Sequence, residues 1–144
     1  MAGTIVSTKQ TGGGRGIVRV DCALTCVAGA ICAQSIGNFY GRLVGIYTDP
    51  TAGAGATMTS TADVLLTDAK TGAAIISDLT FGTAEYKRPT AVITDSAGTA
   101  VTAATTAVDV NRDIFVAGSL NLAIANATTT DTGLISFVFD EGLE

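Results

Sequence analysis

Three cysteines, Cys22, Cys26 and Cys32, are the most reactive side chains of the sequence and lie close together near its N-terminus. Their odd number and the absence of histidine argue against a disulfide framework or a zinc site of mixed ligands. On one extended strand, Cys22 and Cys26 would lie about 13 Å apart, too far for a disulfide. We expect all three to be small buried hydrophobic residues in the reduced state, which points to synthesis in a cytoplasm.

The lack of histidine also excludes serine–histidine and cysteine–histidine nucleophile pairs. Carboxylate pairs could still act as general acid and base. The aspartates, however, fall mostly at expected turns and strand ends, where aspartate accepts hydrogen bonds from nearby backbone. They are Asp21, Asp49, Asp63, Asp68, Asp78, Asp95, Asp109, Asp113 and Asp131. We therefore expect no catalytic residues, and a protein that is not an enzyme.

Two further motifs contain residues that could bind an ion or a phosphate. Asp109, Asn111 and Asp113 alternate and could present oxygens to calcium, but the glycine and glutamate of an EF-hand loop are missing. The glycine-rich run 12–16 precedes an expected strand rather than a helix, so we interpret it as a hinge and not as a phosphate loop. The sequence predicts no metal and no cofactor.

The composition is typical of a subunit of an oligomer or larger assembly. Apolar residues make up 47% of the 144 residues and charged residues only 15%, against roughly one-quarter charged in typical soluble domains. Contacts between subunits are depleted in charge and would cover such a surface. The net charge is −5 and the nearest basic cluster is Lys87-Arg88, so we expect no binding to nucleic acid.

The sequence suggests no targeting or membrane segment. Residues 1–4 lead directly into short polar and β-branched residues without the pattern of a signal peptide. The apolar stretch 22–36 is too short and too mixed for a membrane span. We expect a soluble protein without membrane contact.

β-branched residues and alternation predict strands throughout the chain. Val18, Val20, Cys22 and Leu24 alternate with polar or small residues, as in a strand with one face in the core. Aspartate and glycine at the two ends of 67–72 predict a hairpin turn. The expected strands are 18–25, 40–48, 63–67, 73–77, 90–94, 99–102, 113–117, 119–126 and 132–139.

Three finer expectations follow from the same patterns. In 40–48, Leu43, Gly45 and Tyr47 should share one face of the strand. The strands 119–126 and 132–139 should pair with each other as an antiparallel hairpin at the heart of the core. The stretch 25–35 could instead form a short helix, although Gly29 disfavours it.

Short strands at intervals of roughly ten residues predict an all-β fold, an antiparallel β-sandwich or jelly roll. The triple glycine at 12–14 separates residues 1–14, which we interpret as a flexible N-terminal arm able to reach a neighbouring subunit. Residues 15–144 should form a single sandwich domain.

Several segments resemble small structural virion proteins of tailed bacteriophages. They are GIVRVD at 16–21, GRLVGIYTDP at 41–50, ADVLLTDAKTG at 62–72, VAGSLNL at 116–122 and TGLI at 132–135. The likeness spans most of 16–139, and the chain departs from it around the cysteines and in 79–112. These motifs belong to turns and strands, so they bear on architecture more directly than on a binding site.

The resemblance implies a β-sandwich that decorates or cements a phage capsid. The implied partners are the major capsid protein or other virion subunits, the implied state is a homotrimer or another homo-oligomer, and the implied location is the phage head after synthesis in the host cytoplasm. The alternatives are a neck or tail protein and a carbohydrate-binding module, for which the sequence offers three tyrosines and no tryptophan. The expected contact residues lie in the arm and in a loop: Thr4, Ile5, Val6, Arg15, Tyr86, Lys87 and Arg88.

Overall fold

The computed structural model describes residues 3–11, 16–27, 32–81, 85–87, 91–92, 111–112, 114–128 and 130–142. Eleven strands lie in these ranges: β1 (Thr4–Thr11), β2 (Ile17–Thr25), β3 (Cys32–Asp49), β4 (Ala56–Thr57), β5 (Asp63–Asp68), β6 (Ala74–Thr80), β7 (Glu85–Lys87), β8 (Ala91–Val92), β9 (Asn111–Arg112), β10 (Ile114–Ala125) and β11 (Asp131–Asp140). The predicted all-β class is confirmed. The described part of the chain includes no helix with the length and hydropathy that a membrane crossing needs.

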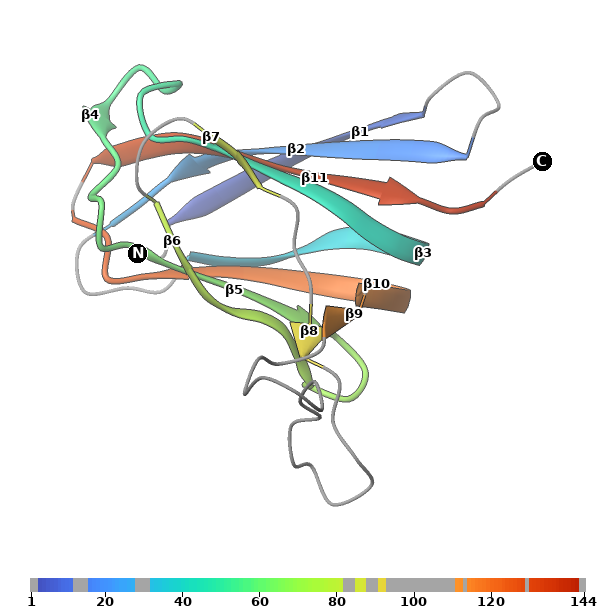
Figure 1. Cartoon of the computed structure of the whole chain (residues 1–144). Coiled ribbons are helices and arrows are strands. Elements are labelled where there is room, and N and C mark those ends of the chain that lie inside the picture. Colours follow the sequence, from blue (N-terminus) through green and yellow to red (C-terminus); the bar gives the residue numbers. More distant parts are fainter. Residues whose placement is uncertain are drawn as a thin grey trace, which may run out of the picture.

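Nine of these strands form one sheet that folds into two layers at β3. The order is β1-β2-β11-β3-β10-β5-β6, with β7 added beside β3 and β4 beside β11. The long β3 belongs to both layers, because its residues 32–43 pair with β10 and its residues 42–49 pair with β11. We call β1, β2, β11, 42–49 of β3 and β7 the first layer, and 32–43 of β3, β10, β5 and β6 the second layer (Figure 1).

The corner of β3 depends on glycine. Gly41 has a φ of 121°, a conformation that other residues rarely adopt. A Cβ at this position would lie 2.3 Å from the carbonyl oxygen of Asp140. A strand that moves from one layer to another needs a bend of this kind, and Gly41 permits it by having no side chain.

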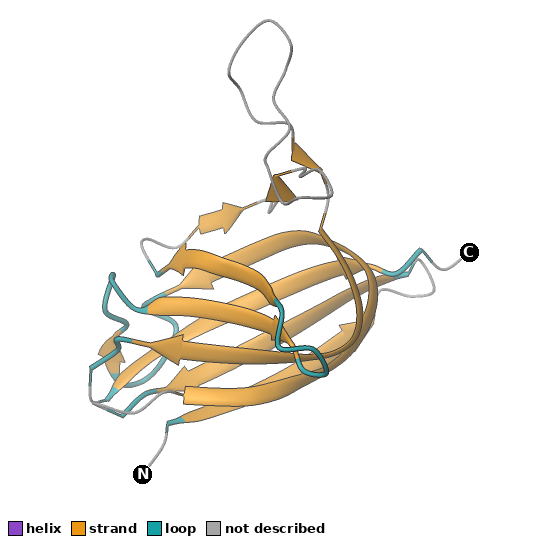
Figure 2. Ribbon diagram, turned by 90° about the horizontal axis from the view of Figure 1, so that it is seen from below, coloured by secondary structure: helices purple, strands orange, loops and turns teal. Residues whose placement is uncertain are grey.

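The strands of the two layers curve around a common interior (Figure 2), and the buried side chains of both layers form one core cluster. The predicted alternation of β2 is confirmed, since Val18, Val20, Cys22 and Leu24 are all buried. Residues from the second layer, among them Leu120, Leu122 and Ile124, meet them from the other side. The rings of Phe39 and Phe139 stack at a centroid distance of 4.3 Å and join the two layers directly.

The predicted hairpin of 67–72 is confirmed. Strands β5 and β6 pair antiparallel on either side of it. Asp68 Oδ1 accepts hydrogen bonds from the backbone N–H groups of Lys70 and Thr71, and Gly72 has a φ of 74°. The aspartate and the glycine therefore have the roles that the sequence indicated.

The predicted hairpin of 119–126 with 132–139 is wrong. Strand β10 pairs with β3 and β5, whereas β11 pairs with β2, β3 and β4. The two strands are not neighbours in the sheet, because β3 lies between them. Their apolar side chains instead belong to the same core from opposite layers. The chain between them crosses from the second layer to the first, and Asn126 and Thr130 both have positive φ there. The expected strands 113–117 and 119–126 are also one strand, β10, that continues through Gly118.

The prediction that Leu43, Gly45 and Tyr47 share one face of the strand 40–48 is wrong as well. Leu43, Ile46 and Thr48 are buried and Tyr47 is half-buried. The register of β3 against β11 shifts between Val138 and Phe139, which are paired with Gly45 and Leu43. This bulge adds one residue to β3 and so exchanges the faces of the residues that follow it.

The prediction of a flexible N-terminal arm is wrong for residues 4–11. Residues 4–11 form β1, which pairs antiparallel with β2 from Thr4 with Thr25 to Thr11 with Val18. Ile5 is in the core at 2% exposure, so burial fixes the register of the strand. Residues 12–15 lie outside the described residues.

The other predicted strands and the predicted short helix lie partly outside the described residues. The expected strand 90–94 is represented by β8, whose described partner is β9, and the expected strand 99–102 lies outside the described residues. The short-helix alternative for 25–35 is not supported, because Thr25 belongs to β2 and 32–35 belong to β3. Residues 28–31 of that stretch are not described.

Candidate interaction surface

The structure brings two of the predicted contact residues, Val6 and Tyr86, to the same side of the first layer. Val6 lies on β1 and is 63% exposed, and Tyr86 lies on β7 and is 60% exposed. Thr4 is exposed on β1, on the same face as Val6. The prediction that Ile5 contacts a partner is wrong, because its side chain points into the core. Of the others, Arg15 and Arg88 lie outside the described residues, and Lys87 is described only as backbone in β7.

An apolar row crosses the first layer beside Val6. The register places Val6 opposite Ala23 on β2, and Ala23 opposite Leu134 on β11. Ala23 is exposed and Leu134 is half-buried, whereas their neighbours Leu24 and Ile135 are fully buried. Because successive side chains of a strand point to opposite faces, this row lies on the outside of the molecule.

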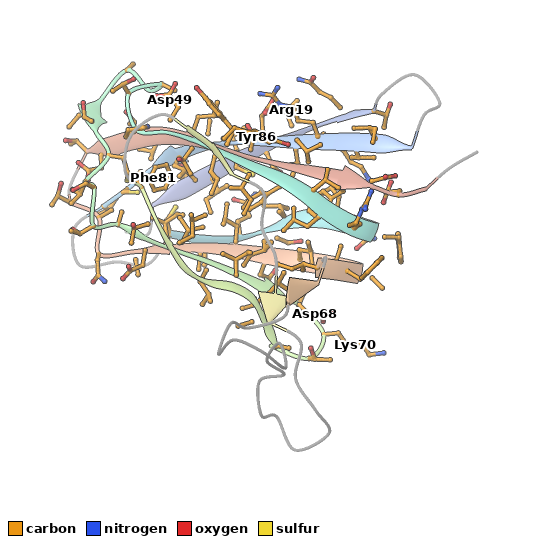
Figure 3. The ribbon with its side chains drawn as sticks, in the orientation of Figure 1. Arg19, Asp49, Asp68, Lys70, Phe81 and Tyr86 are labelled. Carbon is orange, nitrogen blue, oxygen red and sulfur yellow. The ribbon has the colours of Figure 1, made fainter. Side chains whose placement is uncertain are left out.

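The tyrosines lie farther along the same face. Tyr86 is opposite Tyr47, which follows Ser136 in the same cross-strand row. The phenol of Tyr86 lies over Gly45, where a Cβ would be 1.7 Å from its oxygen. We name Val6, Ala23, Leu134, Val138, Tyr47 and Tyr86 together the first-layer face. Figure 3 shows Tyr86 and Arg19 on this side of the molecule.

A small hollow lies between the tyrosines and β2. It is lined by Arg19, Tyr47, Tyr86, Ser136 and Val138, and its volume is about 190 Å³. Pockets that enclose whole small ligands usually measure about 300–1,000 Å³. The hollow suits one protruding side chain or one sugar ring better than an enclosed substrate.

Asp21 supplies a fixed charge at the edge of the hollow. Arg19 Nε donates a hydrogen bond to Asp21 Oδ1 at 2.7 Å, and Ser136 donates to the same oxygen. Burial alone would raise the pKa of Asp21, but the bonds from Ser136 and Arg19 outweigh it and lower the pKa below its usual value. The carboxylate therefore stays ionised and holds Arg19 beside Tyr47.

The loop after β3 borders the face at its other end. Asp49 accepts hydrogen bonds from the backbone and hydroxyl of Thr51. Gly55 N donates to Thr132 Oγ1 at 3.0 Å, and a Cβ at Gly53 would lie 2.1 Å from the same oxygen. Between this loop and the ends of β2 and β11 lies a second hollow, lined in part by Ala23 and Leu134. The glycines allow the loop to pack closely, and it walls one side of the apolar row.

The motifs considered for metal binding do not come together in the described part of the chain. No group of three or more cysteine, aspartate or glutamate side chains there is placed to hold a metal ion. Asp109 and Asp113 are outside the described residues, and Asn111 is described only as backbone in β9. The described residues therefore do not test the calcium alternative, which the sequence disfavours.

Sequence reasoning missed Arg19, Ala23, Leu134, Val138 and Tyr47 as surface residues. The signal was present for Ala23 and Arg19, because both alternate with the buried residues of β2. For Leu134 and Val138 the alternation was equally visible, but the expected contacts lay in the arm and in a loop and not on the faces of strands. Tyr47 was hidden by the bulge in β3, which exchanges the two faces.

No family model, curated protein or solved structure matches this chain.

Proposed function

We propose that this chain is a non-enzymatic structural subunit that docks onto other protein subunits through the first-layer face. The observation that carries the proposal is the row of Val6, Ala23 and Leu134 together with Tyr86, which presents apolar and aromatic side chains on the outside of a paired sheet. Val6 and Tyr86 are the most exposed of these side chains, at 63% and 60%. Apolar side chains grouped on an outer face are typical of surfaces that another molecule covers.

The layout of this face agrees with the anatomy of protein interfaces. Tyrosine and arginine are enriched where binding energy is concentrated, and Tyr47, Tyr86 and Arg19 lie together around the small hollow. The strands beneath them pair across β2, β11 and β3, so the surface is preorganised. A rigid face loses little conformational entropy on binding.

The proposed partner rests on the resemblance to small virion proteins of tailed bacteriophages. We propose a head decoration or cement protein that binds the major capsid protein, with a neck or tail position as the nearest alternative. Many identical copies on a lattice bind with high avidity even when each contact is weak. A homo-oligomer, such as a trimer, would multiply the contacts further.

The first experiment tests the face. Val6→Asp and Tyr86→Ala should each weaken binding to purified capsids of the encoding phage by at least about tenfold in a co-sedimentation assay. Phe115→Asp is the matched control, because Phe115 is 67% exposed on the outer side of β10 in the second layer. The proposed face is wrong if Phe115→Asp weakens binding and the other two variants do not.

A second experiment distinguishes the positions in the particle. Quantitative mass spectrometry of purified virions should find this chain in hundreds of copies if it decorates the head, and in about six to twelve copies if it belongs to the neck. Absence of the chain from purified virions would contradict both positions.

A carbohydrate-binding module is the second candidate, favoured by one observation. Tyr47 and Tyr86 flank a hollow that is also lined by Arg19 and Ser136, both of which bond the carboxylate of Asp21. An aromatic ring beside charged hydrogen-bonding groups can hold a sugar ring. Binding on a glycan array that Tyr86→Ala abolishes would favour this function over capsid binding.

A further inference from the structure

Cys26 and Cys32 lie against each other at the end of the molecule where β2 ends and β3 begins. Both side chains are buried, at 2% and 1% exposure. The thiol of Cys26 donates a hydrogen bond to Cys32 Sγ, and Cys32 Sγ donates to the carbonyl oxygen of Thr25 at 3.8 Å. The side chains of Cys26 and Cys32 therefore lie near each other, and both cysteines are free thiols.

The backbone holds both residues in place. Cys26 N donates to the carbonyl oxygen of Asp131 at 2.8 Å, and Thr130 N donates to the carbonyl oxygen of Cys26. Cys32 is fixed on the other layer by its pairing with Ile124 of β10.

Gly3 leaves the space in which the thiols meet. A Cβ on Gly3 would lie 3.1 Å from Cys26 Cα and 3.1 Å from Cys32 Sγ. The absence of this side chain therefore lets the two cysteines and the start of β1 share a small volume. Cys26 Cα and Cys32 Sγ thus border the same small space, and this proximity makes the pair a candidate for a disulfide, whose Cα atoms lie about 4.4–6.8 Å apart.

We propose that Cys26 and Cys32 form an intramolecular disulfide when the folded protein meets a small disulfide oxidant such as oxidised glutathione. The thiolate of one cysteine attacks the oxidant, forms a mixed disulfide and releases one reduced glutathione. The second thiolate attacks the bound protein sulfur and releases the second glutathione. Two protein thiols are oxidised, one glutathione disulfide is reduced, and the thiol protons go to solvent and to the departing thiolates.

The disulfide would join the two layers at one end of the sandwich. Cys26 follows β2 of the first layer, and Cys32 begins the part of β3 that pairs in the second layer. A bridge here restricts the unfolded chain and secures the layers against separation. A subunit that folds in a reducing compartment and later meets oxidants would gain stability without refolding.

Because both thiols are buried, we expect their thiol–disulfide exchange with glutathione to be slow. Desolvation raises the pKa of the Cys26 thiol to about 11 and also raises the pKa of Cys32. Because the thiolate is the attacking species, the reaction should accelerate as the pH rises above 7.

The test uses the whole chain with oxidised glutathione at pH 8.5, followed by alkylation and intact mass spectrometry. The wild type and Cys22→Ala should each lose two hydrogen atoms, whereas Cys26→Ala and Cys32→Ala should not. Cys22 is a matched control because it is equally buried, on β2, and is the third free thiol. The melting temperature of the wild type should rise by about 5–10 °C on oxidation and fall again with reductant.

Peptide mapping of the wild type tests the proposal even if the cysteine variants fail to fold. All three cysteines lie on the tryptic peptide 20–42, so differential alkylation before and after reduction, read by fragmentation, locates the bridge. A bridge that includes Cys22, stable glutathione adducts without a bridge, or no oxidation at all would each overturn the proposal.

Discussion

Asp131 provides the sharpest test of how this fold is held together. The residue is 2% exposed, and its carboxylate accepts four hydrogen bonds, from the backbone N–H and the hydroxyl of both Thr59 and Thr128. These donors come from two loops that the sequence places far apart. The buried carboxylate therefore ties both loops to the start of β11.

The pKa of Asp131 gives the size of the effect. Burial alone would raise it, but the hydrogen bonds from Thr59 and Thr128 outweigh burial and lower the pKa to about 2, from an ordinary 3.8. A shift of this size corresponds to about 2 kcal/mol of folding free energy. Because the folded pKa is the lower one, this stability is fully present above pH 4 and is lost as the pH falls from about 4 towards 2.

The perturbation is Asp131→Asn. The amide keeps one acceptor oxygen and turns an NH₂ group towards donors, so we expect the variant to lose about 2–3 kcal/mol at pH 7. With roughly 4 °C per kcal/mol for a chain of this size, the melting temperature should fall by about 8–12 °C. Urea unfolding at several pH values measures both the loss and its pH dependence.

The pH dependence separates this reasoning from a general loss of packing. The wild type should lose stability between pH 4 and pH 2 more steeply than Asp131→Asn, by about 2 kcal/mol over that interval. Thr132→Val is the matched control, since Thr132 Oγ1 bonds Gly55 and Ala56 rather than Asp131, and its pH dependence should follow the wild type. Parallel curves for the wild type and Asp131→Asn would refute the argument.

Three further variants test the corner, the core and the turn by urea unfolding at pH 7. Gly41→Ala should destabilise by about 3 kcal/mol or more, because its φ of 121° and the nearby oxygen of Asp140 leave no room for a Cβ; a loss below about 1 kcal/mol would show that the corner can relax. Phe139→Leu removes the stack with Phe39 and should cost about 1–3 kcal/mol, and an unchanged midpoint would contradict that contact. Gly72→Ala meets no atom within 4 Å, so only its positive φ should count, at about 1–2 kcal/mol; a larger loss would mean that the turn is packed.

The sequence predicted the features that depend on neighbours along the chain. Alternation identified the buried face of β2, since side chains two apart share a face whatever the fold. The turn at 67–72 was predictable because Asp68 bonds backbone only two and three residues away and Gly72 supplies its own positive φ. The all-β class followed from the same local preferences.

Tertiary structure decided which strands are neighbours wherever no tight turn joins them. Alternation says which side of a strand is buried but not which strand lies beside it, so β10 and β11 looked like a hairpin and instead face each other across the core. One bulge in β3 exchanged its faces and moved Tyr47 to the first-layer face. Burial of Ile5 made a paired strand of the predicted arm.

The candidate sites show the same division. Val6 and Tyr86 were predicted one by one from the sequence, but only the register of five strands placed them on a common face with Leu134. The proximity of Cys26 to Cys32 and the bonds of Asp131 to Thr59 join different layers and loops. Such contacts depend on where the corner at Gly41 sends the chain, and that geometry comes from long-range packing that no local pattern encodes.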